Sequence, residues 1–245
     1  MTTTNERNFQ RLIKEGMDRY QQAIDANSPK NRIRLANKCI LKMKNAMKLS
    51  DLLELDDELG YVYEYVSLSQ ALIAEAYVEL KDLISAVHQF NKAKKSNMKT
   101  LKNEETYIRG CYIESKLLEI ALLQQNWSVV DDLCQNIYKM VKKIDDYTKK
   151  IKYYRTIVSA FIKSKNISWL KKGYRKLVKV AKGLSDEDPE QLKEKAVIFY
   201  EYGEILKKVL NKKRKSRKYL EKAKEKFEAM NLIAYAKKAE DMMED

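Results

Sequence analysis

Apolar residues recur three and four positions apart along almost the whole chain, which is the pattern of amphipathic helices. The first run covers about residues 6–26 and places on one face Phe9, Leu12, Ile13, Met17, Tyr20 and Ile24. Ser28-Pro29 combines a capping residue with a proline at the first helical position, so it predicts the start of a second helix. The residues from Ser50 to Asp57 are expected to form an acidic connection after that helix.

The later segments follow the same pattern and predict ten or eleven helices in total. These pair into five hairpins over about residues 6–48, 57–96, 104–143, 145–183 and 188–229, followed by a terminal helix over 231–243. Because the connections are only about two to nine residues long, consecutive helices are expected to lie antiparallel as neighbours. None of the connections is long enough to mark a boundary, so we expect a single domain over residues 1–245.

The composition favours an all-α fold. The 245 residues include only 6 Gly and 2 Pro, whereas sheet folds use both residue types at their frequent turns. Hydrophobic residues make up 44% of the chain, which is enough for a buried core. The sequence contains no run of about 18 apolar residues, and its first seven residues lack the basic and apolar segments of a signal peptide. These features predict a cytoplasmic protein without a membrane span.

Few residues in the chain are suited to catalysis or metal binding. Cys39, Cys111 and Cys134 are far apart, and together with His88, the single histidine, they do not form the close ligand pairs of a structural zinc site. We expect the three cysteines to be partly buried thiols that pack as small apolar groups. His88 lies within a predicted helix, and the glycines are scattered singly, so neither a histidine-activated nucleophile nor a phosphate-binding loop is indicated. The sequence therefore predicts no catalytic residue, no metal and no cofactor, in a protein that is not an enzyme.

One segment, from Ser67 to Lys99, resembles a tetratricopeptide repeat (TPR). The residues that carry the resemblance are Ala74 and Tyr77 in the first helix, a turn at Lys81-Asp82, and Leu83, Ala86, Phe90 and Ala93 in the second helix. The two alanines let the helix backbones approach closely, and Tyr77 and Phe90 fill the space beside them. Gln70 stands where the family has a tryptophan, and Lys81 stands where it has a turn glycine.

Weaker echoes of the same pattern occur in the other hairpins. The matching positions are Ala36, Ala86, Val130, Leu170 and Ser216, which are 50, 44, 40 and 46 residues apart. The family period is about 34 residues, so the helices here are longer than standard. The resemblance implies an all-α fold, a right-handed superhelical array of antiparallel hairpins (a TPR-like α-solenoid). An unrelated helical bundle is the alternative.

The distribution of charge suggests an anionic partner. The net charge is +14, and between Asp146 and Asp186 there are twelve basic residues and no acidic one. The resemblance implies a concave side lined by the first helix of each hairpin. Because basic residues are expected on that side, we expect it to bind an acidic or phosphorylated peptide. The residues of that side are Lys152, Arg155, Lys163, Arg11, Lys14, Lys207, Lys208, Tyr112 and Tyr200. Glu75 and Glu79 interrupt this basic lining, and ordinary solvated helix faces are the alternative interpretation.

Two further basic segments stand out. A predicted turn between helices carries Lys212, Lys213, Arg214, Lys215, Arg217 and Lys218, which could contact phosphates. The predicted eighth helix is also basic, but its apolar stripe of Leu170, Tyr174, Leu177 and Ala181 is expected in the core. The function predicted from the sequence is a protein–protein interaction scaffold, and the alternative is a protein that makes nonspecific phosphate contacts with nucleic acid. The sequence leaves the oligomeric state open.

Overall fold

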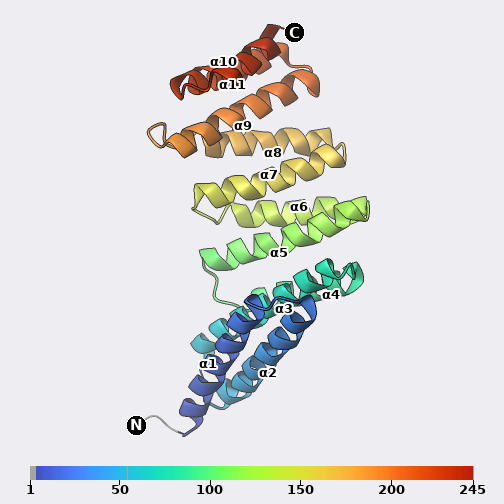
Figure 1. Cartoon of the computed structure of the whole chain (residues 1–245), viewed down its shortest axis with the longest axis vertical. Coiled ribbons are helices and arrows are strands. Elements are labelled where there is room, and N and C mark those ends of the chain that lie inside the picture. The colour runs from blue at the N-terminus through green and yellow to red at the C-terminus, as the bar shows by residue number, and fades with distance from the viewer. Residues whose placement is uncertain (1–3, 54, 245) are drawn as a thin grey trace. The chain divides into compact units, whose positions relative to one another are not determined.

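The computed structural model describes residues 4–53 and 55–244, except for the side chains of Asp56, Asp57 and Ser168. The described residues form helices and no strand, so the prediction of an all-α fold is confirmed (Figure 1). The helices are α1 (Thr4–Ile24), α2 (Pro29–Leu53), α3 (Asp56–Glu79), α4 (Leu83–Asn97), α5 (Glu104–Leu123), α6 (Trp127–Val141), α7 (Tyr147–Lys163), α8 (Ile167–Ala181), α9 (Pro189–Lys208), α10 (Lys213–Ala229) and α11 (Ile233–Glu244).

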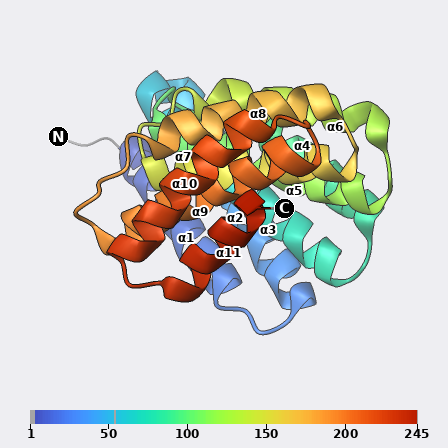
Figure 2. The same ribbon diagram turned by 90° about the horizontal axis from the view of Figure 1, so that it is seen from above.

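The helices group into two compact units, unit 1 over residues 1–143 and unit 2 over residues 144–245. Unit 1 contains the hairpins α1–α2, α3–α4 and α5–α6, and unit 2 contains α7–α8 and α9–α10, with α11 packed on α10. The two helices of each hairpin pack against each other (Figure 1; Figure 2 gives the view from above). These pairs are the five hairpins expected from the sequence. The expectation that they make up one domain stays a prediction.

The helix starts show which local signals were informative. Ser28 caps α2, since its Oγ accepts a hydrogen bond from the amide of Asn31 at 3.3 Å. Asp188 caps α9 in the same way, ahead of Pro189. The acidic connection expected over residues 50–57 is wrong, because α2 continues to Leu53. Ser50 is buried and donates a hydrogen bond to the carbonyl of Leu55 at 3.0 Å, which holds the end of that helix in the core.

The turns provide the clearest structural repeat. A single residue with positive φ, between 47° and 62°, ends α3, α5, α7, α9 and α10, and these residues are Lys81, Gln125, Lys165, Asn211 and Asn231. At all of these turns except the one at Asn211, the next amide bonds to a carbonyl five residues earlier, as in Asp82 to Tyr77 at 2.9 Å. This is the Schellman arrangement at a helix C-terminus. The first four turns are 44, 40 and 46 residues apart. These are the intervals that separate the matching positions from Ala86 onward in the sequence.

The TPR-like packing occurs where the sequence places it. Ala74, Ala86 and Phe90 are fully buried in one cluster formed by α3, α4 and α5, with Tyr77 and Leu83 packed against it. Close helix approach recurs in the last hairpin, where the Oγ of Ser216 donates to the carbonyl of Gly203 at 2.7 Å. A Cβ added at Gly203 would lie 2.7 Å from the Cγ of Leu220, so any larger residue would force the Leu220 side chain to move.

Candidate functional site

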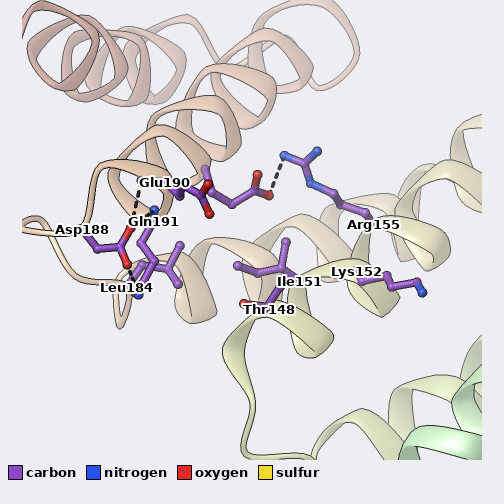
Figure 3. A pocket seen from close by; sticks show the side chains of 9 residues that line it. Thr148, Ile151, Lys152, Arg155, Leu184, Asp188, Glu190 and Gln191 are labelled. Atoms are coloured by element: carbon purple, nitrogen blue, oxygen red, sulfur yellow. Dashed lines mark hydrogen bonds and ion pairs between the residues drawn. The ribbon is translucent and has the colours of Figure 1, made fainter. Parts of the chain in front are cut away.

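A pocket of about 460 Å³ opens in unit 2 between α7 and the start of α9, and we call it the α7–α9 pocket (Figure 3). Its lining residues come from α7, from the loop after α8 and from the first two turns of α9. They are Thr148, Ile151, Lys152, Arg155, Leu184, Asp188, Glu190, Gln191 and Glu194. Two of the three residues central to the sequence-based hypothesis, Lys152 and Arg155, therefore lie at one pocket.

The loop that forms one wall of this pocket is held by side-chain hydrogen bonds. The carboxylate of Asp188 accepts from the amides of Glu190 at 2.9 Å and Gln191 at 3.0 Å, and its second oxygen accepts from the side-chain amide of Gln191. These bonds, with the backbone amide of Gln191 first, lower the pKa of Asp188 from its usual 3.8. The Gln191 side chain also accepts a hydrogen bond from the amide of Ser185. Asp188 therefore has a structural role as the N-cap of α9.

Arg155 links α7 to α9 by two ion pairs. Its Nη2 lies 3.1 Å from Oε1 of Glu194 and 3.4 Å from Oε2 of Glu201. Figure 3 shows the guanidinium reaching toward α9, whereas Lys152 extends away from the α9 carboxylates. Burial raises the pKa of Glu201, and the positive charge of Arg155 opposes that rise. The Nε atom of Arg155 is buried and has no hydrogen-bond acceptor among the described residues, whereas the buried Nη2 is held by the two ion pairs.

The α7–α9 pocket consequently carries charges of both signs. Lys152 is exposed, whereas Arg155 forms ion pairs with Glu194 and Glu201. The sequence alone did not predict these two partners. Lys163 is the last residue of α7. It lies eleven residues beyond Lys152, about 16 Å along the helix axis, and on the same face. The structure therefore does not bring Lys163 into the pocket with the other two.

A second pocket, of about 350 Å³, opens in unit 1 between α3 and α5, and we call it the α3–α5 pocket. Its residues are Glu75, Val78, Glu79, Phe90, Lys116, Glu119, Ile120 and Leu123. Burial raises the pKa of Glu75 above its usual 4.5, and the nearby charges of Lys116 and Arg32 oppose the rise. Arg32 of α2 also forms an ion pair with Glu79. Glu75 and Glu79, the two residues expected to interrupt the predicted basic lining, both line this pocket.

The other residues predicted on the first helices lie apart from these pockets. In unit 1, Arg11 and Lys14 are exposed on α1, and Tyr112 is half-buried against the core. In unit 2, the ammonium of Lys207 on α9 donates a hydrogen bond to the carbonyl of Met242 at 2.8 Å, which holds α11 against α9. Lys208 pairs with Glu204 on its own helix, and Tyr200 is half-buried.

The basic turn is divided between two surfaces by the rotation of α10. Three of its residues, Lys212, Lys215 and Lys218, line a third pocket, whereas Lys213 and Arg217 face the end of α11 and Arg214 is exposed. On the far side of the third pocket are Lys171 and Arg175 of α8, which the sequence analysis did not select as site residues. Their signal in the sequence was the acid-free stretch that contains them. The apolar stripe of α8 is buried, as expected.

The three thiols pack in the core as expected, although they are fully rather than partly buried, and His88 lies within a helix. Cys39, Cys111 and Cys134 are free and buried, and burial raises the pKa of Cys111 and Cys134 to about 12. His88 is exposed on α4. Among the described residues, no group of His, Cys, Asp and Glu side chains is placed to hold a metal ion. No helix within residues 4–53 and 55–244 is long and apolar enough to cross a membrane.

Comparison with known proteins supports the fold. No protein-family model matches the sequence, and no curated protein matches it. The solved structure of BtubC (BKLC) from P. vanneervenii is 12% identical with a TM-score of 0.53, over 94% of this chain and 93% of that one. A signal transduction ATPase with a tetratricopeptide repeat sensor, PH0952 from Pyrococcus horikoshii, is 16% identical with a TM-score of 0.50, over 91% of this chain and 35% of that one. The chain therefore has a TPR-like helical-repeat fold and spans about a third of the ATPase.

Proposed function

We propose that the protein is a non-enzymatic interaction scaffold that binds a partner protein through a peptide segment. The observation that carries this proposal is the position of the two pockets. Each opens between the first helices of two consecutive hairpins, α3 and α5 in unit 1 and α7 and α9 in unit 2. Their volumes, about 350 and 460 Å³, lie within the range of roughly 300–1,000 Å³ that is typical of ligand pockets. Surfaces of this kind in helical-repeat folds bind extended segments.

The segment bound at the α7–α9 pocket is acidic or phosphorylated in this proposal. Lys152 and Lys163 are exposed cations on one face of α7, about 16 Å apart, a distance that about five extended residues span. Arg155 adds a positive charge in the same pocket, although its Nη2 is already held by ion pairs with Glu194 and Glu201. A partner anion reaches the guanidinium only when these carboxylates move aside, so one ion pair replaces another.

The carboxylates of the pocket restrict what binds there. Asp188 caps α9 and Glu194 pairs with Arg155, so both negative charges are already balanced in part. Glu190, in the first turn of α9, is stabilised there by the helix dipole. A partner whose anionic groups lie along α7, away from the start of α9, is not repelled by these three carboxylates.

The test selects peptides from a random library, including phosphorylated members, on the full-length protein. We expect enrichment of acidic or phosphorylated peptides, and Lys152→Glu/Lys163→Glu should weaken their binding by about tenfold or more in fluorescence polarisation. The control, Lys179→Glu/Lys237→Glu, changes the net charge equally at exposed positions outside both pockets. Enrichment of peptides without acidic groups would contradict the acidic preference. Equal weakening in the control would contradict the assignment to α7.

A further inference from the structure

The third pocket, about 310 Å³ in unit 2, is lined by seven basic side chains and by no acidic one. We call it the basic pocket. From α8 and its C-cap come Lys171, Arg175 and Lys182, and from α10 and its N-cap come Lys212, Lys215, Lys218 and Lys222. Tyr202 and Leu206 of α9 and Tyr219 of α10 complete the lining.

Two separate stretches of sequence meet here because of the hairpin stacking. On α8, Lys171 and Arg175 are one turn apart, and on α10 the four lysines recur at three- and four-residue intervals, so each set shares one helix face. Helices α8 and α10 both pack against α9. Their basic faces therefore border the same hollow, whose wall between them is formed by Tyr202 and Leu206.

This concentration of charge opposes the stability of the folded unit. Within the described part of the chain, none of the seven forms an ion pair with a carboxylate. The pKa of Lys171 is lowered from 10.5, chiefly by the charge of Lys212 and then by those of Arg175 and Lys215. The first turn of α10 is also basic and has no acidic residue, although the helix dipole favours anions at that end. Departures of this kind from local stability rules are typical of functional sites.

We propose that the basic pocket binds a compact anion that carries several phosphate groups. Six of the seven cations are lysines, which act as point charges toward phosphate. Because a phosphate monoester carries about −1.5 to −2 charges at neutral pH, about four such groups balance seven cations. The volume lies at the small end of ligand pockets, which favours a compact molecule.

The aromatic residues of the pocket favour this ligand over a nucleic acid strand. Tyr202 is buried and its ring stacks on that of Tyr174, with 5.7 Å between the ring centroids. It also meets the ring of Tyr219 edge-on, with 4.8 Å between the centroids. Proteins that bind single strands use aromatic faces as platforms for successive bases. Here the rings pack against one another instead. A free polyphosphorylated molecule and a phosphorylated lipid headgroup share the proposed chemistry.

The experiment is isothermal titration calorimetry of the full-length protein with inositol hexakisphosphate and tripolyphosphate at about 150 mM salt. Both probes should bind with an affinity that falls as salt rises, and inorganic phosphate should bind far more weakly. Lys171→Gln/Lys215→Gln should weaken binding by about tenfold or more. The matched control, Lys193→Gln/Lys237→Gln, loses the same charge at exposed positions outside the pocket and should keep the wild-type affinity. Binding to vesicles that contain phosphatidylinositol bisphosphate would indicate a lipid headgroup as the source of the phosphates, and binding to the soluble probes alone would indicate a free molecule.

A thermal unfolding measurement shows that a loss of binding is not a loss of fold. Lys171→Gln/Lys215→Gln should unfold at or above the wild-type temperature, because it removes repulsion. The proposal is overturned if neither probe binds, if the control loses as much affinity as the pocket variant, or if short single-stranded DNA binds more tightly than the compact probes. The outcome is independent of the proposed peptide binding, since no residue of the α7–α9 pocket is changed.

Discussion

Replacing Lys94 by methionine is expected to destabilise the packing of α4, α5 and α6 in unit 1. The ammonium of Lys94 lies 2.6 Å from Oε1 of Glu114, whose side chain is only 3% exposed. Asn136 of α6 donates to the same oxygen at 3.2 Å, and Oε2 of Glu114 is buried with no hydrogen-bond donor among the described residues. Lys94 thus supplies the countercharge of a carboxylate that water does not reach.

The size of the effect follows from that burial. Removing one partner of a buried ion pair costs about 3–5 kcal/mol, and the lower end applies because the Lys94 side chain is 37% exposed. Glu114→Gln should cost only about 1 kcal/mol, since the amide keeps a hydrogen-bonding group beside Asn136. Lys94→Met/Glu114→Gln no longer contains the unpaired Glu114 carboxylate. Its loss of unfolding free energy should therefore be about 2 kcal/mol smaller than the sum of the two single losses.

Urea unfolding followed by circular dichroism measures the double-mutant cycle. Hydrogen exchange by mass spectrometry should place the loss of protection in α4, α5 and α6, because repeat packing is governed by neighbouring helices. If the costs of the single changes simply add in the double variant, the carboxylate is not held by Lys94 and the reasoning is refuted.

Two further predictions concern unit 2. Lys165 has a φ of 56°, and Lys165→Gly should stabilise the α7–α8 turn by about 0.5–1 kcal/mol in thermal unfolding, because glycine avoids the cost of this conformation; an unchanged or lower stability would contradict this. Hydrogen bonds from Lys226 and Lys195 lower the pKa of Asp186 in the folded protein. The Asp186 carboxylate therefore stabilises the fold at pH values above its usual pKa of 3.8, and this stabilisation is lost as the pH falls through the lowered pKa. Asp186→Asn should therefore be less stable than wild type at pH 7, with a difference in urea midpoint that closes below about pH 4; a constant difference would show that the carboxylate charge is not responsible.

Much of the architecture follows from local features of the sequence. The hairpins were predictable because a helix that buries one face repeats its apolar residues every three or four positions, whatever it packs against. The register of the last four hairpins was also predictable from the matching positions Ala86, Val130, Leu170 and Ser216, and the structure shows that each of them follows a left-handed turn residue by five positions. The end of α2 was misjudged, because Ser50 and its polar neighbours resemble a connection, whereas in the structure Ser50 is buried and hydrogen-bonded to the carbonyl of Leu55.

The charge of each candidate surface was decided only by the tertiary structure. By itself the sequence predicted paired helices that resemble a helical repeat, and it showed an excess of cations on α7, α8 and the start of α10. It did not show that Arg155 would meet Glu194 and Glu201 of α9, or that Lys171 and Lys212 would border one hollow. The physical reason is that burial periodicity depends on one helix alone, whereas the pairing of charges depends on how consecutive hairpins are rotated and offset when they stack.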